Sequence, residues 1–232
     1  MSMELGQLAP RILRHLDIWG NEDMLIYARD QWQSTIALCV LQISISCAFM
    51  QKERILWRQR KMIAIDNEEG RYVILEYEKF ILIGLYVPNS GSALVRLEYR
   101  TRIWDKWLRA KCKQLSAKKP IVIAGDMNVA KDDIDISHPE RHHRTAGFTD
   151  EERSNYELLL NECKLVDLWR DRHPSTIAYT YFDYRTRARL RNSGWRLDYI
   201  LSSQMMKKHL RRIHIYDKVY GSDHLPIMAE FF

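Results

Sequence analysis

Three short polar segments of the sequence lie next to apolar, strand-like runs and could carry chemistry. The first, residues 125–128, reads Gly-Asp-Met-Asn and follows the apolar run 121–124, which is typical of a strand buried on both faces. Asp126 and Asn128 are two positions apart, so on an extended segment both side chains point to the same side. A carboxylate and an amide placed in this way could bind a metal ion or a phosphate. The same residues also suit an ordinary turn, which is the alternative for this segment taken alone.

The other two segments supply an imidazole and two more carboxylates. Residues 221–226 read Gly-Ser-Asp-His-Leu-Pro and place Asp223 beside His224. An imidazole titrates near neutral pH and, when protonated, can stabilise a phosphoryl oxygen, while a carboxylate can bind a hard cation. Residues 194–199, Gly-Trp-Arg-Leu-Asp-Tyr, place Asp198 at the start of an apolar strand, where it could orient His224. Taken singly, the Asp-His pair could be a loop hydrogen bond and Asp198 a cap or an ion-pair partner.

Apolar patterns predict the elements that would position these segments. Residues 72–77 and 80–86 are β-rich runs joined by two polar residues, which predicts a hairpin. Apolar residues recur at near-helical spacing over 93–115, and Thr149 with Glu152 forms a capping-box pattern, so two helices are expected. Further strands are predicted at 197–201, 212–216 and 227–231. Strands that alternate with helices and include a hairpin predict a mixed α/β architecture with packed sheets.

The composition is that of a folded, soluble protein with one larger domain. Its 232 residues are 46% hydrophobic and 28% charged, which argues against a disordered, fibrous or low-complexity chain. Lys and Arg total 36 against 30 Asp and Glu, so the net charge of +6 permits a polyanionic partner without requiring one. The four cysteines are widely spaced and form no CxxC pair, which favours a reducing compartment.

The first third of the chain carries no recognisable chemistry. Its first residues lack a basic stretch followed by an apolar core, so we expect no secretory signal and a chain that stays inside the cell. Residues 31–51 are uncharged over a length that could span a membrane, but glutamine, serine and threonine interrupt them. We therefore favour a buried strand with its flanks and no membrane association. Strand-like alternation occurs at 43–46, and the basic stretch 52–61 could be helical.

Basic residues concentrate late in the chain. Between residues 183 and 212 the only acids are Asp183 and Asp198. The cations of this stretch are Arg185, Arg187, Arg189, Arg191, Arg196, Lys207, Lys208, Arg211 and Arg212. A stripe of positive charges suits the binding of a phosphate backbone, whereas a solvated loop usually carries both positive and negative charges.

Together with two further motifs, the three polar segments resemble the apurinic/apyrimidinic endonuclease branch of the exonuclease III family, within the endonuclease/exonuclease/phosphatase superfamily. The further motifs are Leu-Tyr-Val-Pro-Asn-Ser-Gly at 85–91 and Ala-Gly-Phe-Thr at 146–149, with additional matches at 94–100 and 179–199. The motifs occur in the family's order from about residue 68 to residue 232. The resemblance implies a four-layered α/β sandwich of two packed mixed sheets flanked by helices.

The resemblance also implies roles for individual residues. Tyr86 resembles the phosphate-contacting tyrosine, Asp126 the acid/base aspartate and Asn128 the amide that positions nucleophile or phosphate. Asp198 and His224 resemble the family's carboxylate and imidazole pair.

Substrate and metal roles are implied in the same way. The substrate-binding residues are Asn89, Tyr181, Arg185, Trp195 and Leu197. Among them, Tyr181, Trp195 and Leu197 match the small apolar pocket for a flipped, base-free sugar, and Arg185 matches a residue that reaches into the duplex. The metal ligands are Asp126, Asn128, Asp223 and His224, and the implied ion is Mg²⁺, with Mn²⁺ as an alternative.

The implied activity is Mg²⁺-assisted hydrolysis of the phosphodiester 5′ to an abasic site, leaving a 3′-hydroxyl. This makes the expected protein a DNA-repair endonuclease of base excision repair, which could also act as an exonuclease. We expect a monomer whose partner is double-stranded DNA containing abasic sites. The expected compartment is the nucleus in a eukaryote and the cytoplasm otherwise.

The N-terminal third departs from the family's pattern. Members begin this domain with a strand that carries an Asn and an Asp, followed later by Leu-Gln-Glu, whose Glu is a principal metal ligand. Here Leu41 and Gln42 are followed by Ile43. We therefore expect a divergent segment at 1–67 without recognisable family motifs and the C-terminal portion of the family's domain at 68–232, so that the sandwich is incomplete at its N-terminus.

This departure supports a second function from another class. Without the glutamate, the chain could be a catalytically impaired or inactive protein of the same family that binds DNA lesions. A phosphatase of the superfamily is the third candidate, and the Trp195 and Ala-Gly-Phe motifs favour the DNA-repair branch over it.

Overall fold

The larger of two sheets forms the centre of the fold. The computed structural model describes residues 25–30, 36–41, 61–62 and 71–232. The strand order of this sheet is β3 (Lys61–Met62), β4 (Tyr72–Glu76), β5 (Ile81–Tyr86), β6 (Ile121–Asp126), β8 (Asp198–Ser203) and β7 (Leu165–Asp167). Strands β5 and β6 pair in parallel and the other neighbours pair antiparallel, so the sheet is mixed.

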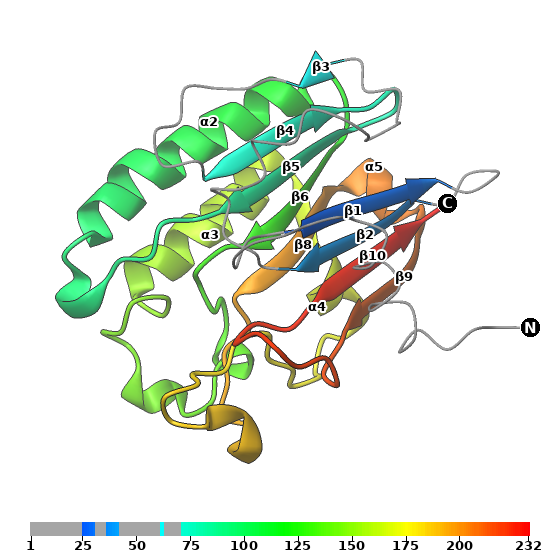
Figure 1. Ribbon diagram of the computed structural model, residues 1–232. Helices are drawn as coiled ribbons and strands as arrows, with labels where there is room; N and C mark the ends of the chain where they lie inside the picture. Colours follow the sequence, from blue (N-terminus) through cyan, green and yellow to red (C-terminus); the bar gives the residue numbers. More distant parts are fainter. Residues whose placement is uncertain (1–24, 31–35, 42–60, 63–70) are drawn as a thin grey trace, which may run out of the picture.

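A second sheet of four strands faces the larger one (Figure 1). Its order is β1 (Leu25–Asp30), β2 (Ile36–Leu41), β10 (Ile227–Phe231) and β9 (Leu210–Ile215). All three pairings are antiparallel. The expected pair of packed sheets is confirmed, although in the described strands only the larger sheet is mixed.

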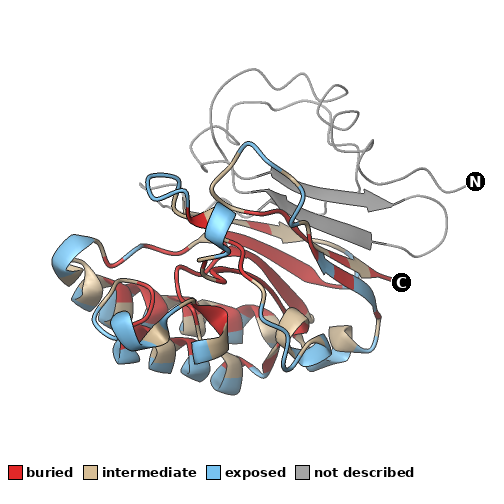
Figure 2. Ribbon diagram, turned by 90° about the horizontal axis from the view of Figure 1, so that it is seen from below, coloured by how far each residue is buried: buried red, intermediate tan, exposed pale blue. Residues whose placement is uncertain are grey.

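Two long helices cover the outer face of the larger sheet (Figures 1 and 2). They are α2 (Asp105–Ser116) and α3 (Asp150–Cys163). The short helices α4 (Leu168–Arg172) and α5 (Gln204–Lys207) follow β7 and β8. The connections contain the short helical segments η3 (Ser92–Leu94), η4 (Tyr99–Trp104), η5 (Asp133–Asp135), η6 (Pro139–Arg141) and η7 (Ala188–Arg191).

Alternating side chains of β5 and β6 divide between two cores. Ile83 and Ile123 pack in one core with apolar residues of α2 and α3. Leu82 and Val122 pack in the other with residues of β9 and β10. Since successive side chains of a strand point to opposite faces, β6 is buried on both, as its apolar run predicts. Both cores therefore fix the end of β6, where Asp126 lies.

Most predicted elements are confirmed. Strands β4 and β5 form the expected hairpin, and the Thr149 hydroxyl caps α3 by accepting a hydrogen bond from the Glu152 N–H at 3.2 Å. The helix expected over 93–115 begins later, as η4 followed by α2. Ala93 and Leu94 have φ of 54° and 62°, left-handed values that a continuous right-handed helix cannot contain.

The expectations for the first third of the chain are tested only in part. Within 31–51 the described residues form β2, which fits the favoured strand. In the part of the chain that the structure describes, every helix is too short or too polar to cross a membrane. The strand-like alternation at 43–46 and nearly all of the basic stretch 52–61 lie outside the described residues.

Candidate active site

Three neighbouring strands bring polar side chains into one row. Tyr86, the last residue of β5, pairs with Asp126, the last residue of β6, in the parallel register. Asp126 in turn pairs with Asp198, the first residue of β8, in the antiparallel register. Both aspartates are almost fully buried, at 3% and 4% exposure. The motifs that the sequence places far apart are therefore adjacent at this edge of the sheet.

Gly125 allows β6 to end in this position. Its φ is +147°, and a Cβ built there would lie 1.9 Å from the backbone oxygen of Leu85. That distance is far inside van der Waals contact, so any side chain would push β6 away from β5. The glycine before Asp126 thus sets the approach of the two strands and, with it, the place of the carboxylate.

Asn128 links the end of β6 to the loop after β5. Its backbone N–H donates to Asp126 Oδ1 at 2.7 Å, and its side-chain amide donates to the Val87 carbonyl at 2.8 Å. Its Oδ1 accepts from Asn89 Nδ2 at 2.9 Å. Asn128 has a left-handed φ of 47°, which asparagine tolerates better than most residues. Asn89 and Asn128 therefore lie together in the site, as the motifs imply.

Asp198 and His224 form the predicted pair. Their Oδ2 and Nδ1 atoms lie 2.8 Å apart, and the side chains are 3% and 9% exposed. The His224 backbone N–H donates to Ser222 Oγ at 3.1 Å, which fixes the loop before the imidazole. The Tyr181 ring lies against the imidazole, with centroids 4.9 Å apart.

Burial raises the pKa of Asp126 from 3.8 to about 7, and the neighbouring Asp198 adds to this shift. His224, the N–H of Asn128 and Arg100 act in the opposite direction. A buried carboxyl whose pKa lies near neutral pH can accept and release a proton under physiological conditions. This raised pKa is compatible with the acid/base role that the resemblance implies for Asp126, and the role itself stays a prediction.

The pKa of His224 is raised, which keeps its imidazole charged at neutral pH. Burial lowers its pKa, but the charge and hydrogen bond of Asp198, together with Asp126 and Asp223, outweigh burial and raise the pKa from 6.5 to about 9. Burial and the charge of Asp126 raise the pKa of Tyr86, so its phenol stays protonated. At neutral pH the site thus offers a cationic imidazole and a phenolic donor beside Asp126.

An apolar cluster adjoins this row. Leu197 packs with Ala130, Ile136 and Phe148, and the partly buried rings of Tyr181 and Trp195 lie against them. The Trp195 backbone pairs with both Tyr181 and Ile136 through isolated bridges. The three residues predicted to receive a base-free sugar are therefore brought together.

The remaining predicted residues lie at the margins of the site. Asp223 is partly buried, and its carbonyl accepts from the Phe182 N–H at 2.8 Å. Arg185 is exposed, and its backbone N–H donates to Asp183 Oδ1 at 2.9 Å. The arginine thus lies in the loop after Tyr181, and its predicted role in the duplex stays a prediction.

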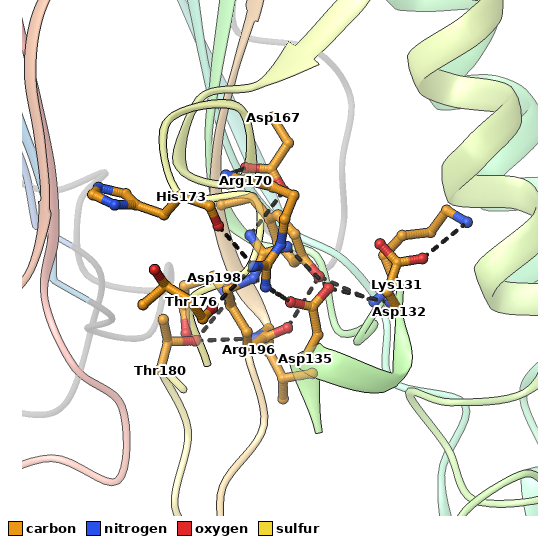
Figure 3. Close-up of polar contacts among 12 residues, drawn as sticks. Lys131, Asp132, Asp135, Asp167, Arg170, His173, Thr176, Thr180, Arg196 and Asp198 are labelled. Carbon is orange, nitrogen blue, oxygen red and sulfur yellow. Dashed lines mark hydrogen bonds and ion pairs between the residues drawn. The ribbon is translucent and has the colours of Figure 1, made fainter. Parts of the chain in front are cut away.

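The prediction that Arg196 belongs to the basic surface stripe is wrong, because its side chain is 1% exposed. Its guanidinium bonds to Asp135 at 2.7 and 3.0 Å and to Asp167 at 2.8 Å, and Arg170 completes the network by bonding to Asp135 (Figure 3). Burying an arginine requires such carboxylate partners, and these partners lie far away along the chain. Arg196 is therefore a structural cation and not a surface contact for phosphate.

The predicted metal ligands do not complete a metal site by themselves. In the described part of the chain, no group of three or more His, Cys, Asp or Glu residues is placed to hold one ion. The Asn128 Oδ1 already accepts from Asn89, and the His224 Nδ1 faces Asp198. Asp126 and Asp223 are the only carboxylates among the predicted ligands, and two carboxylates are too few for a site made of protein ligands alone.

Comparison with known proteins agrees with this geometry. Residues 45–224 match the Endonuclease/Exonuclease/phosphatase family. The chain belongs to this family. The match begins inside the segment 1–67, in which we expected no recognisable motif.

Relatives within the family are named for DNA repair. The Recombination repair protein 1 of Drosophila melanogaster is 46% identical over 172 residues, covering 72% of this chain and 25% of that protein. The DNA repair nuclease APEX1 of Danio rerio is 42% identical over 162 residues, covering 69% and 52%. The crystal structure of the AP endonuclease LMAP from Leishmania major matches with a TM-score of 0.68 and 29% identity, covering 71% and 55%. The chain thus spans about half, or less, of the length of these relatives.

Three further residues contact the site without having been singled out from the sequence. Arg100 is 2% exposed and donates to the carbonyls of Pro88 and Met127. It therefore links the loop after β5 to the loop after β6. His142 lies edge-on to Trp195, with centroids 5.0 Å apart, and burial lowers its pKa. Thr180 bonds to the start of β8. Arg100 and Thr180 lay within segments that matched the family, at 94–100 and 179–199, whereas His142 lay outside them.

Proposed function

We propose that this chain hydrolyses the DNA backbone 5′ to an abasic site and leaves a 3′-hydroxyl. The observation that carries the proposal is the row in which Asp126, with a pKa of about 7, lies beside the Asp198–His224 pair. The relatives' names support the reaction class. The apolar cluster of Tyr181, Trp195 and Leu197 supports a sugar without a base as the group bound next to the reacting phosphate.

Each residue of the row has a separate role in the proposed hydrolysis. Asp126 takes a proton from the attacking water, and the oxygen of that water forms a bond to phosphorus. Protonated His224 and the Tyr86 phenol stabilise the negative charge that develops on the phosphate. The bond from phosphorus to the 3′ oxygen breaks, and this oxygen takes up a proton from a solvent water molecule, while protonated Asp126 returns its proton to solvent. Asn128, held by Val87, Asn89 and Asp126, orients the water or the phosphate.

The family resemblance adds a divalent cation, with Mg²⁺ as the expected ion and Mn²⁺ as a substitute. We include the cation in the proposal without assigning its ligands, because the described donors do not complete a site. The DNA-repair names of the relatives also support action where chromosomal DNA lies, which is the nucleus in a eukaryote and the cytoplasm otherwise. A monomeric state stays a prediction.

Incision of a duplex with one abasic site tests the proposal. We expect cutting 5′ to the site, with a product that a polymerase can extend. The substitutions Asp126→Asn and His224→Ala should each lower the rate by about 100-fold or more, because each removes a proton-transfer or charge-stabilising group. Arg102→Ala is the control, since Arg102 lies in η4, is exposed and pairs with the equally exposed Glu98. Full activity in both site variants would assign the reaction to other residues.

The missing Leu-Gln-Glu motif, in which Ile43 stands in place of the family's metal-binding Glu, favours the second candidate, a lesion-binding protein that cuts poorly or not at all. A Mg²⁺ titration separates the two. Cutting that needs unusually high Mg²⁺ supports an enzyme with a weak metal site, because phosphate oxygens can replace a missing carboxylate. Tight binding of abasic duplex without cutting at any Mg²⁺ concentration would establish the binder.

A further inference from the structure

The side chain of one buried threonine bonds to the strand that carries Asp198. Thr180 is 0% exposed, and its Oγ1 accepts hydrogen bonds from the backbone N–H groups of Leu197 and Asp198, both at 3.0 Å. Figure 3 shows Thr180 next to Asp198 at the start of β8. A hydroxyl oxygen has two lone pairs, and here both N–H groups use the same oxygen.

The backbone of the same residue bonds to the loop that carries His224. The Thr180 carbonyl accepts from the N–H of Leu225, the residue after His224, at 2.7 Å. The next residue, Tyr181, pairs with both Trp195 and His224 through isolated bridges. The segment 180–181 therefore lies between the two partners of the pair and contacts both.

Of the hydrogen bonds that Thr180 makes, only those to its hydroxyl depend on the type of side chain at this position. Its carbonyl bond would survive most substitutions, whereas the bonds to Leu197 and Asp198 require an oxygen on Cβ. An isosteric valine would leave two buried N–H groups without this acceptor, and they would have to find another by moving. The start of β8, and Asp198 with it, would then shift relative to His224.

We propose that Thr180 is a positioning residue, whose hydroxyl fixes Asp198 at the distance and angle at which it bonds to His224. The catalytic part of this inference rests on the proposed function, because the pair matters for turnover only if the chain cuts DNA. The geometric part does not, since the hydrogen bond between the pair exists without substrate.

The test compares Thr180→Val, which removes the oxygen, with Thr180→Ser, which keeps it. The first readout is the low-field proton resonance of the His224 imidazole N–H bonded to Asp198, recorded without DNA. The second is kcat on an abasic duplex at saturating substrate. We expect Thr180→Val to shift or broaden the resonance and to lower kcat by about 10- to 100-fold, because small displacements of catalytic groups are costly. Thr180→Ser should restore both.

Two controls separate positioning from general destabilisation. Thr101→Val makes the same chemical change at a threonine whose hydroxyl donates only to the Leu97 carbonyl. Leu115→Val lowers stability in the core beside α2, away from the row. Both should keep the resonance and kcat of the parent chain at a temperature where all variants are folded.

The outcomes are distinct for the two proposals. An unchanged resonance in Thr180→Val, or a resonance lost equally in Thr180→Ser, overturns the positioning role. If Thr180→Val does not fold, Thr180→Ala removes the same oxygen and is judged by the same readouts. A parent chain that never cuts abasic DNA refutes the proposed function, while the resonance in the variants still decides the role of Thr180.

Discussion

The pKa values of Asp126 and His224 are both raised. The shift favours the neutral form of the Asp126 carboxyl and the charged form of the His224 imidazole. Burial and Asp198 raise the pKa of Asp126 to about 7, so its base form becomes available only as the pH passes neutrality. The pKa of His224 is lowered by burial but raised by Asp198 to about 9, so its cationic form persists until the solution is alkaline. The form of the site with ionised Asp126 and charged His224 is therefore most populated between these two values.

A bell-shaped pH profile should follow from these two groups. We expect kcat/KM for incision to rise with pH through about 7, as Asp126 loses its proton, and to fall above about 9, as His224 loses its own. The measurement is the initial rate at subsaturating abasic duplex and constant Mg²⁺. In His224→Gln the residual activity should lose the alkaline limb and keep an acidic limb, displaced to higher pH because the imidazolium no longer lowers the pKa of Asp126. A parent profile that is flat through neutral pH would contradict the assignment of Asp126 as the base.

At the scale of elements, β8 begins beside a buried group of charges. Arg196 precedes Asp198 by two residues and bonds to Asp135 of η5 and to Asp167 at the end of β7. Its guanidinium also lies over the Tyr199 ring, 4.3 Å from the centroid. The Arg196 side chain thus links η5 and the end of β7 to the start of β8, the strand that begins with Asp198.

Removing this cation should destabilise the fold strongly. We expect Arg196→Ala to lower the free energy of unfolding by about 3–5 kcal/mol, because two buried carboxylates lose their main partner. Arg102→Ala, which breaks the exposed pair with Glu98, should cost about 0.5 kcal/mol or less. Urea unfolding of both variants measures the difference. Similar losses in the two would show that the Arg196 network contributes no more than a surface ion pair.

Local signals explain which elements the sequence could predict. The hairpin, the doubly buried β6 and the Thr149 cap depend on residues close together in the chain, and all three are confirmed. The late start of the helix near η4 depends on left-handed backbone at Ala93 and Leu94, residues that usually avoid it, so no local signal marked it. The burial of Arg196 depends on carboxylates 29 and 61 positions away.

The same distinction holds for the site. Each motif could be singled out because its residue types suit a polar site, and the sheet register places Tyr86, Asp126 and Asp198 side by side. The contacts of Thr180 and His142 run to residues 17 to 18 positions away or to a ring on another segment. A threonine or a histidine in a loop gives no indication of such contacts before the chain is folded.

At the scale of the whole molecule, the positive surface is smaller than the count of basic residues suggests. Arg196 is buried, Lys207 pairs with Asp171, and Arg211 pairs with Glu230. Arg189 stacks on the Tyr220 ring, 3.9 Å from its centroid. The exposed arginines of the loop after Tyr181 are Arg185, Arg187 and Arg191. We therefore expect this loop, which follows Tyr181 of the apolar cluster, to contact the phosphate backbone.

Arg187→Ala tests that placement. Because phosphate contacts carry no sequence information, binding to intact and abasic duplexes should weaken alike, and the slope of log Kd against log salt should fall by about 1. Fluorescence anisotropy over a salt series gives the slope, with Arg102→Ala as the matched surface control. The parent chain should still prefer the abasic duplex. An unchanged slope in Arg187→Ala would move the DNA-binding surface away from this loop.

The Asp198–His224 hydrogen bond also joins the two layers of the sandwich. Asp198 opens β8 of the larger sheet, while His224 lies three residues before β10, the strand through which β9 and β2 are joined in the facing sheet. Any relative sliding of the layers therefore stretches this bond before it disturbs the hydrogen bonds within either sheet. We therefore expect cosolvents or pressure that alter the packing between the two sheets to change the rate of the proposed incision while the secondary structure remains intact.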